Sequence, residues 1–179
     1  MNAQAAHRFD NARRYRDGDH PSQTWFTPDY VLDLVRLDLG GIWGDPCTTM
    51  DNPVRADLFY TVMNDGLSQP WHSDVGPIEQ QTLFVNPPYS KAREPWVNKC
   101  IEAGSRGQKV ILLIPAATDT RIFQKAASTA SAVVFVKGRL KFGVLRPNRR
   151  QVAASHPSAL IGWNTDLDAC AALGWRADV

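Results

Sequence analysis

The segment Val110-Ile111-Leu112-Leu113-Ile114 is an unbroken run of five large apolar residues. Runs of this kind are typical of parallel strands that helices cover on both faces, because neither side of such a strand meets water. We therefore expect residues 110–114 to lie at the centre of a sheet.

Short apolar segments recur on both sides of this run and alternate with amphipathic ones. The segments that resemble strands are 42–43, 58–63, 82–85, 132–136 and 158–163, and those that resemble helices are 28–39, 95–103 and 120–130. The first helix is expected to use Thr27 as its N-cap and Pro28 as its first residue. Alternation with right-handed crossovers predicts an α/β fold with a mostly parallel, doubly wound sheet.

The composition is that of an ordinary globular protein. The chain has 179 residues, of which 44% are hydrophobic and 21% are charged, and its formal net charge is +2. This balance excludes disorder, collagen and coiled coil as descriptions of the whole chain. No apolar run approaches the roughly 18–20 residues that cross a bilayer, and the first residues lack the apolar core of a signal peptide. We expect a cytoplasmic protein with no membrane partner.

The chain divides into three parts by pattern. Residues 1–20 are polar and rich in arginine, which predicts a flexible basic arm. Residues 21–165 hold the alternating strands and helices of the main domain, and residues 166–179 are expected to form a C-terminal tail. The length fits a single folded domain.

Neither a metal site nor a disulfide is expected. The chain has three cysteines, Cys47, Cys100 and Cys170, which are too far apart to make a CxxC pair. The histidines at 20, 72 and 156 have no cysteine or carboxylate at ligand spacing.

The most informative motif is Asn86-Pro87-Pro88-Tyr89, which directly follows the apolar segment 82–85. Ligands of open α/β sheets bind beyond the carboxyl ends of the strands. The prolines hold the backbone rigid, so the Asn86 side-chain oxygen and the Pro87 carbonyl are fixed acceptors for the two hydrogens of one amino group. Tyr89 offers a face on which a base can stack. The alternative is a structural turn, since both dipeptides are common in turns.

A stretch without acidic residues runs from Asp119 to Asp166. We predict that its cations, together with Arg121 at its start, contact phosphates, the alternative being a solvated face. The candidates are Arg121, Lys137, Arg139, Lys141, Arg149 and Arg150. Thr118 or Asp119 is expected to cap the helix that begins near Arg121.

The tetrapeptide is similar to the catalytic motif of amino-group methyltransferases that use S-adenosylmethionine. The whole set of motifs resembles the phage-type Dam-like DNA N6-adenine methyltransferases over about residues 22–163. The motifs that carry this resemblance, in order, are 22–28, 45–47 with Asn52, 64–67 with Trp71, 86–89, 113–116 with 118–121, and 138–142.

The resemblance implies a Rossmann-like class I methyltransferase domain that transfers a methyl group to an adenine flipped out of double-stranded DNA. Asn86, Pro87, Pro88 and Tyr89 would be catalytic, and the protein would act as a monomer or homodimer, in the host cytoplasm if a phage encodes it. A role in restriction-modification belongs to the same expectation. The residues implied to hold S-adenosylmethionine are Trp25, Thr27, Pro28, Asp45 and Asp65.

Two other functions stay open at this point. The motif also serves methyltransferases of RNA and of protein glutamine. The chain lacks the glycine-rich turn expected after the first strand, at residues 45–49, which leaves room for a DNA-binding protein that has lost its cofactor.

Overall fold

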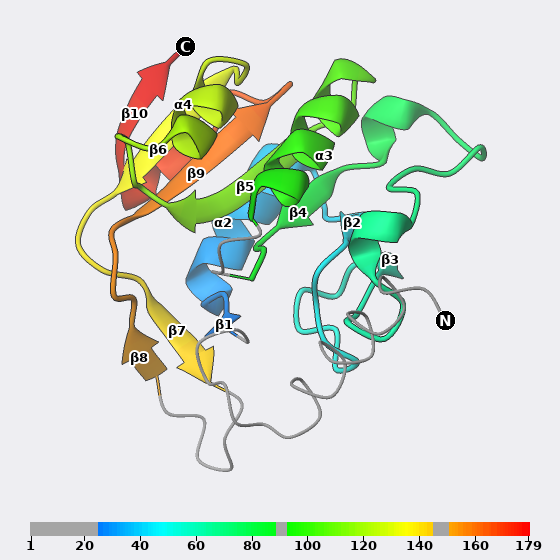
Figure 1. Cartoon of the computed structure of the whole chain (residues 1–179), viewed down its shortest axis with the longest axis horizontal. Coiled ribbons are helices and arrows are strands. Elements are labelled where there is room, and N and C mark those ends of the chain that lie inside the picture. Colours follow the sequence, from blue (N-terminus) through cyan, green and yellow to red (C-terminus); the bar gives the residue numbers. More distant parts are fainter. Residues whose placement is uncertain (1–24, 89–92, 145–150) are drawn as a thin grey trace, which may run out of the picture.

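A seven-stranded sheet forms the body of the protein (Figure 1). The computed structural model describes residues 25–88, 93–144 and 151–179. From one edge to the other the strands are β10 (Gly174–Asp178), β6 (Ala132–Val136), β9 (Ser158–Trp163), β5 (Val110–Pro115), β4 (Leu83–Val85), β2 (Gly44–Asp45) and β3 (Leu58–Phe59). The expected α/β class is confirmed, and β5 occupies the middle position.

The sheet is mixed, and a mostly parallel sheet is not confirmed. The pairs β2–β3, β2–β4 and β4–β5 are parallel, whereas β5–β9, β6–β9 and β6–β10 are antiparallel. The antiparallel half arises because β9 inserts between β5 and β6. All six residues of β9 are buried, so its sequence looks like that of a parallel strand and does not reveal its direction.

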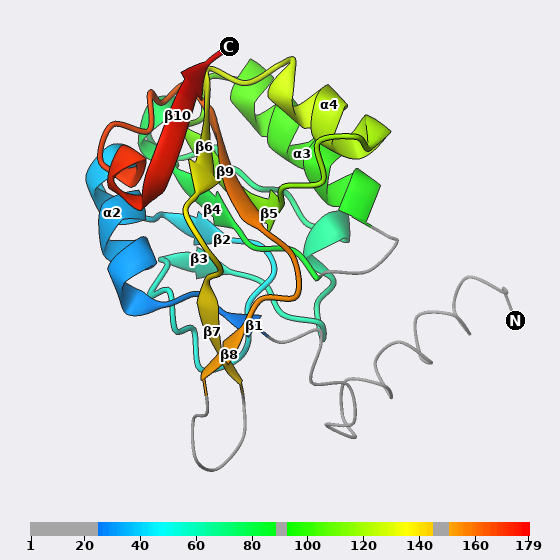
Figure 2. The same ribbon diagram turned by 90° about the vertical axis from the view of Figure 1, so that its left-hand side faces the viewer.

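Helices cover both faces of the sheet, as Figure 2 shows. Helix α2 (Asp29–Leu39) lies on one face, and α3 (Glu94–Ser105) and α4 (Arg121–Ala127) lie on the other. Ile111 and Leu113 of β5 pack on the α2 side, while Leu112 packs on the side of α3 and α4. This two-sided burial explains the unbroken apolar run of β5.

Helix termini differ in detail from the sequence expectation. Helix α2 starts at Asp29 without a side-chain cap, because the hydroxyl of Thr27 is used elsewhere, and it ends at Gly40 with φ 75°. Helix α4 is capped by Thr120, whose Oγ1 accepts a bond from the Phe123 N–H, rather than by Thr118 or Asp119.

A second, smaller sheet projects from the body at the lower end of Figure 1. It consists of β1 (Trp25–Phe26), β7 (Lys141–Val144) and β8 (Gln151–Ala153), all antiparallel. The rings of Trp25 and Phe142 meet edge to face at 5.3 Å, which holds β1 on β7.

Short elements complete the fold. They are the 3-10 helices η1 (Gly66–Ser68), η2 (Ile78–Gln80) and η4 (Cys170–Leu173). Within residues 166–179, η4 packs against α2 and β10 joins the main sheet. No helix in the described part of the chain is long and apolar enough to cross a membrane.

Candidate active site

The motif residues Asn86, Pro87 and Pro88 follow β4 directly, at the carboxyl end of the parallel strands. Pro87 is buried, and Asn86 is partly exposed. Tyr89 lies outside the described residues, as do Arg149 and Arg150. The structure therefore places the first part of the motif at the sheet edge where α/β proteins bind ligands.

The side-chain amide of Asn86 is held in one orientation. Its Nδ2 donates to the backbone carbonyl of Trp25 at 3.0 Å and to Thr27 Oγ1 at 3.2 Å. Because a carbonyl only accepts hydrogen bonds, the nitrogen must face Trp25 and the oxygen must face away. That oxygen, Oδ1, is buried and has no hydrogen-bond partner among the described residues.

An unpaired buried acceptor is rare because it costs the free energy of desolvation without the return of a bond. The Oδ1 of Asn86 is thus an acceptor that is aimed and rigid but unused. A ligand that brings an N–H group would satisfy it.

Trp25 and Thr27 therefore contact the motif although about 60 residues separate them from Asn86 in the sequence. The predicted role of Thr27 as N-cap of α2 is wrong, because its hydroxyl accepts from Asn86 instead. Pro28 is buried and directly precedes α2, at the N-cap position.

Asp45 is the last residue of β2 and is 5% exposed. Since Gly44 pairs with Leu83, the ends of β2 and β4 lie side by side. Burial raises the pKa of the Asp45 carboxyl from 3.8 to about 7, although bonds from Cys47 and Thr48 oppose the rise. A neutral Asp45 carboxyl can both donate and accept hydrogen bonds near pH 7. A cation bound beside it would lower its pKa and favour the ionised carboxylate.

The turn after β2 forms without glycine. Asp45 Oδ1 accepts from the backbone N–H of Cys47 at 3.1 Å, an arrangement that lets an aspartate close its own turn. This explains the missing glycine-rich turn at residues 45–49.

The thiol of Cys47 connects this turn to the motif. The backbone N–H of Asn86 bonds to it. Burial, followed by the charge of Asp45, raises the pKa of the thiol well above its usual value, so the thiol stays protonated. All three cysteines are free, and the described ranges hold no group of three or more potential metal ligands.

Asp65 approaches the same end of the sheet through a close backbone contact. It has φ 47° and precedes η1. A Cβ built on the next residue, Gly66, would lie 1.8 Å from the carbonyl oxygen of Pro46. Only glycine lets the turn at Asp65 lie so close to the turn at Asp45.

The loop that carries Asp65 is fixed by two side chains. Trp71 Nε1 donates to the Gly66 carbonyl at 2.8 Å, and Lys99 Nζ donates to the carbonyls of Leu67 at 3.1 Å and Gln69 at 2.5 Å. The Lys99 ammonium also lies 4.8 Å from the centre of the Trp71 ring. Sequence reasoning missed Lys99, because a single lysine on a helix gives no signal of such a role.

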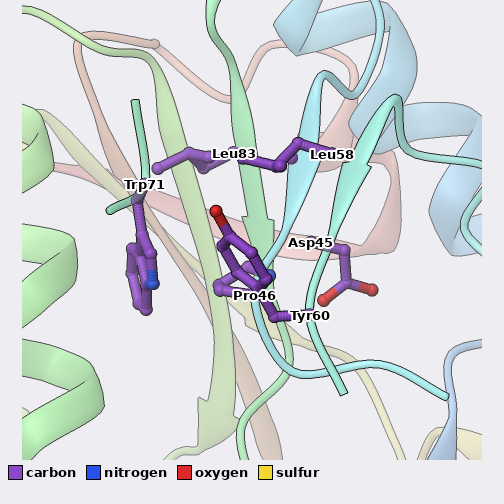
Figure 3. A pocket seen from close by; sticks show the side chains of 7 residues that line it. Asp45, Pro46, Leu58, Tyr60, Trp71 and Leu83 are labelled. Atoms are coloured by element: carbon purple, nitrogen blue, oxygen red, sulfur yellow. The ribbon is translucent and has the colours of Figure 1, made fainter. Parts of the chain in front are cut away.

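A shallow hollow with no enclosed space for a water molecule lies beside these turns (Figure 3). In Figure 3 the ring of Tyr60 stands between the indole of Trp71 and the carboxyl of Asp45. Tyr60 is fixed by its bond to the Pro70 carbonyl at 2.9 Å. The hollow is lined by Gly44, Asp45, Pro46, Leu58, Tyr60, Trp71 and Leu83. Because ligand sites usually enclose about 300–1,000 Å³, this hollow is not by itself a ligand site.

The predicted cations of the described part lie in two regions. Lys137 and Arg139 belong to the turn between β6 and β7, and Lys141 starts β7; all three are exposed. Strand β7 pairs with β1, which carries Trp25. Arg121 is exposed at the start of α4, on a separate element.

Comparison with known proteins identifies the family of the chain. A search of curated proteins gives no match. The family model described as DNA N-6-adenine-methyltransferase (Dam) matches residues 17–168, which is most of the chain and contains β4 with the motif after it. This confirms the resemblance inferred from the order of the motifs. The chain therefore belongs to the DNA N-6-adenine-methyltransferase (Dam) family.

Proposed function

We propose that this protein transfers a methyl group from S-adenosylmethionine to N6 of an adenine that is flipped out of double-stranded DNA. One observation carries the proposal: Asn86 Oδ1 is buried, oriented and without a donor among the described residues. The exocyclic amino group of adenine has two hydrogens. Asn86 Oδ1 accepts one, and the carbonyl of Pro87 accepts the other.

The two acceptors act on the shape of the nitrogen. In free adenine its lone pair is delocalised into the ring, so the amine is a poor nucleophile. Hydrogen bonds from both N–H groups to fixed acceptors favour a tetrahedral nitrogen whose lone pair points at the methyl donor. This stabilisation grows toward the transition state, which is the condition for catalysis. A neutral amide orients the amine and does not act as a strong base. As the N–C bond forms, the bond from carbon to sulfur breaks and leaves a neutral thioether, and the N6 proton departs to solvent after the transfer.

The residues at the end of β2 suit the proposed cofactor. When bound, S-adenosylmethionine supplies an activated methyl group on a cationic sulfur. Its ammonium and hydroxyl groups are donors, and Asp45 and Asp65 offer carboxylate acceptors on turns that are packed together. Trp25 and Thr27 accept hydrogen bonds from Asn86, and Pro28 directly follows Thr27 in the chain, so these three residues are proposed to border the cofactor as well. The layered sheet with helices on both faces supports the Rossmann-like class I assignment.

The target base must leave the duplex, which costs a few kcal/mol. In this proposal Tyr89 stacks on the flipped base and recovers about 1–3 kcal/mol of that cost. Lys137, Arg139 and Lys141 contact the flanking phosphates, and Arg121 is assigned the same role, as are Arg149 and Arg150 outside the described ranges.

The test is transfer of tritiated methyl from S-adenosylmethionine to adenine-bearing duplex DNA by the full chain. The expected product is N6-methyladenine. Asn86→Ala should lower the rate at least 100-fold while cofactor affinity stays within a few fold, because the lost bond goes to the target amine rather than to the cofactor and strengthens toward the transition state. Asn98→Ala is the matched control, since Asn98 is an exposed asparagine on α3.

The outcome that contradicts the proposal is no label in DNA. Preferential transfer to RNA or to protein glutamine would instead assign a different amino substrate to the same site. Salt-dependent DNA binding without calorimetric binding of S-adenosylmethionine would indicate a non-catalytic DNA-binding protein.

A further inference from the structure

Strand β10 forms one edge of the main sheet, as Figure 2 shows at its left. An edge strand presents unpaired backbone groups that can pair with another strand. Two large apolar side chains near this edge are also exposed: Trp175 at 68% and Val179 at 63%. Large apolar side chains exposed at an open edge call for an explanation, because such surfaces often mark sites of association.

The pairing with β6 decides which backbone groups face outward. Bonds from the Lys137 N–H to the Leu173 carbonyl, and from the Val179 N–H to the Ser131 carbonyl, lie at its two ends. Because such bonds alternate along an antiparallel pair, the odd-numbered residues of β10 turn their backbone groups to β6. The groups that turn to the open edge belong to Gly174, Arg176 and Asp178.

The side chains of β10 also separate into two faces. Trp175 stacks on Phe135 with ring centres 5.4 Å apart, on the side of α4. Arg176 points to the opposite face, where it pairs with Asp168 and, at 3.2 Å, with Asp178. The edge is therefore apolar on one face and charged on the other.

We propose that β10 pairs antiparallel with β10 of a second copy of this chain, with Ala177 on the two-fold axis. In this register Arg176 lies opposite Asp178 of the second copy, and these residues have the outward backbone groups that exchange hydrogen bonds. Trp175 lies opposite Val179 of the second copy in a non-hydrogen-bonded pair, where side chains approach most closely. The edge is thus complementary to itself in charge and in apolar surface.

Neighbouring registers lack this complementarity. If the two strands slide by two residues in one direction, Arg176 lies opposite Arg176 of the second copy. If they slide by two residues in the other direction, Asp178 lies opposite Asp178. Like charges directly opposite each other destabilise a strand pair. A shift by one residue turns Trp175 to the charged face of the second copy. Isologous two-fold contacts of this kind give closed dimers.

The experiment is sedimentation equilibrium of the full chain over a range of protein concentrations, without DNA or cofactor. The proposed contact consists of one five-residue strand from each copy, so we expect a reversible dimer whose fraction rises with concentration. Arg176→Asp and Asp178→Arg should each weaken dimerisation at least tenfold, since each brings like charges together. Asp168→Asn removes a partner of Arg176 within the chain and should leave the dimer unchanged.

The decisive sample is an equimolar mixture of the Arg176→Asp and Asp178→Arg proteins. Each variant then faces the opposite charges of the other, so a mixed dimer should form although neither variant dimerises alone. A wild-type chain that stays monomeric, or a mixture that does not associate, would overturn the proposal. If Arg176→Asp fails to fold, Trp175→Ser replaces it, and dimerisation that persists in that variant contradicts the register. Because no methyl transfer is measured, the result is independent of the proposed function.

Discussion

Asp45 gives the protein a dependence of stability on pH that can be calculated. Its carboxyl has a pKa of about 7 in the folded protein against 3.8 ordinarily, because burial disfavours the charged form. Between these values the unfolded chain carries an ionised Asp45 while the folded protein keeps it neutral. Folding therefore takes up a proton, and stability falls as pH rises through this window.

The magnitude follows from the pKa difference. At about 1.36 kcal/mol per pH unit, the window from 3.8 to about 7 amounts to about 4 kcal/mol as an upper bound. Below pH 4 both states are protonated and above pH 7 both are ionised, so the dependence levels off at both ends. Asp45→Asn keeps an oxygen for the Cys47 N–H but cannot ionise.

The assay is urea unfolding of wild type and Asp45→Asn at half-unit steps between pH 4 and 8. The free energy of unfolding of wild type, minus that of the variant, should decrease by up to about 4 kcal/mol from pH 4 to pH 8. Taking the difference removes the contributions of other titrating groups. Asp51→Asn, at an exposed position in the same loop, is the control for the removal of a surface carboxyl. If the difference between wild type and Asp45→Asn does not change with pH, the Asp45 carboxyl is hydrated in the folded protein, and the reasoning fails.

Three further predictions concern the contacts around the site. Thr27→Val removes one of the two groups that accept hydrogen bonds from the Asn86 side-chain amide, and should slow methyl transfer about tenfold in single-turnover kinetics. Thr27→Ser keeps the hydroxyl and should keep the wild-type rate. Gly66→Ala should lower the free energy of unfolding by about 1–3 kcal/mol or more because its Cβ meets the Pro46 oxygen at 1.8 Å. Gly76→Ala, with positive φ but no atom within 4 Å, should cost only about 1 kcal/mol; equal losses would refute the contact. Lys141→Ala should weaken DNA binding on all sequences and reduce the slope of log K against log salt by about 1, and an unchanged slope would exclude a phosphate contact.

The sequence was most informative where one physical requirement governed a whole segment. The apolar run of β5 predicted its two-sided burial, and the apolar segment before the prolines predicted that the motif directly follows a buried strand, β4. The direction of β9 could not be predicted, because a buried strand has the same composition whichever way it runs. Residues 174–178 have no buried apolar run, so the sequence indicated only a C-terminal tail where β10 lies. Thr27 was misassigned since a threonine before a helix suits a cap and a long-range acceptor equally well.

The orientation of Asn86 depends on a residue that no local pattern connects to it. The Trp25 carbonyl is offered by β1, and β1 is held in place by its pairing with β7, far along the chain. A sequence pattern reports the residues that form the corner but not the strand that orients the amide. The orientation of Asn86 Oδ1, on which the proposed chemistry depends, is consequently set by the small sheet as well as by the motif. Changes in β7 that loosen β1 should therefore reduce methyl transfer more than they reduce the stability of the main sheet.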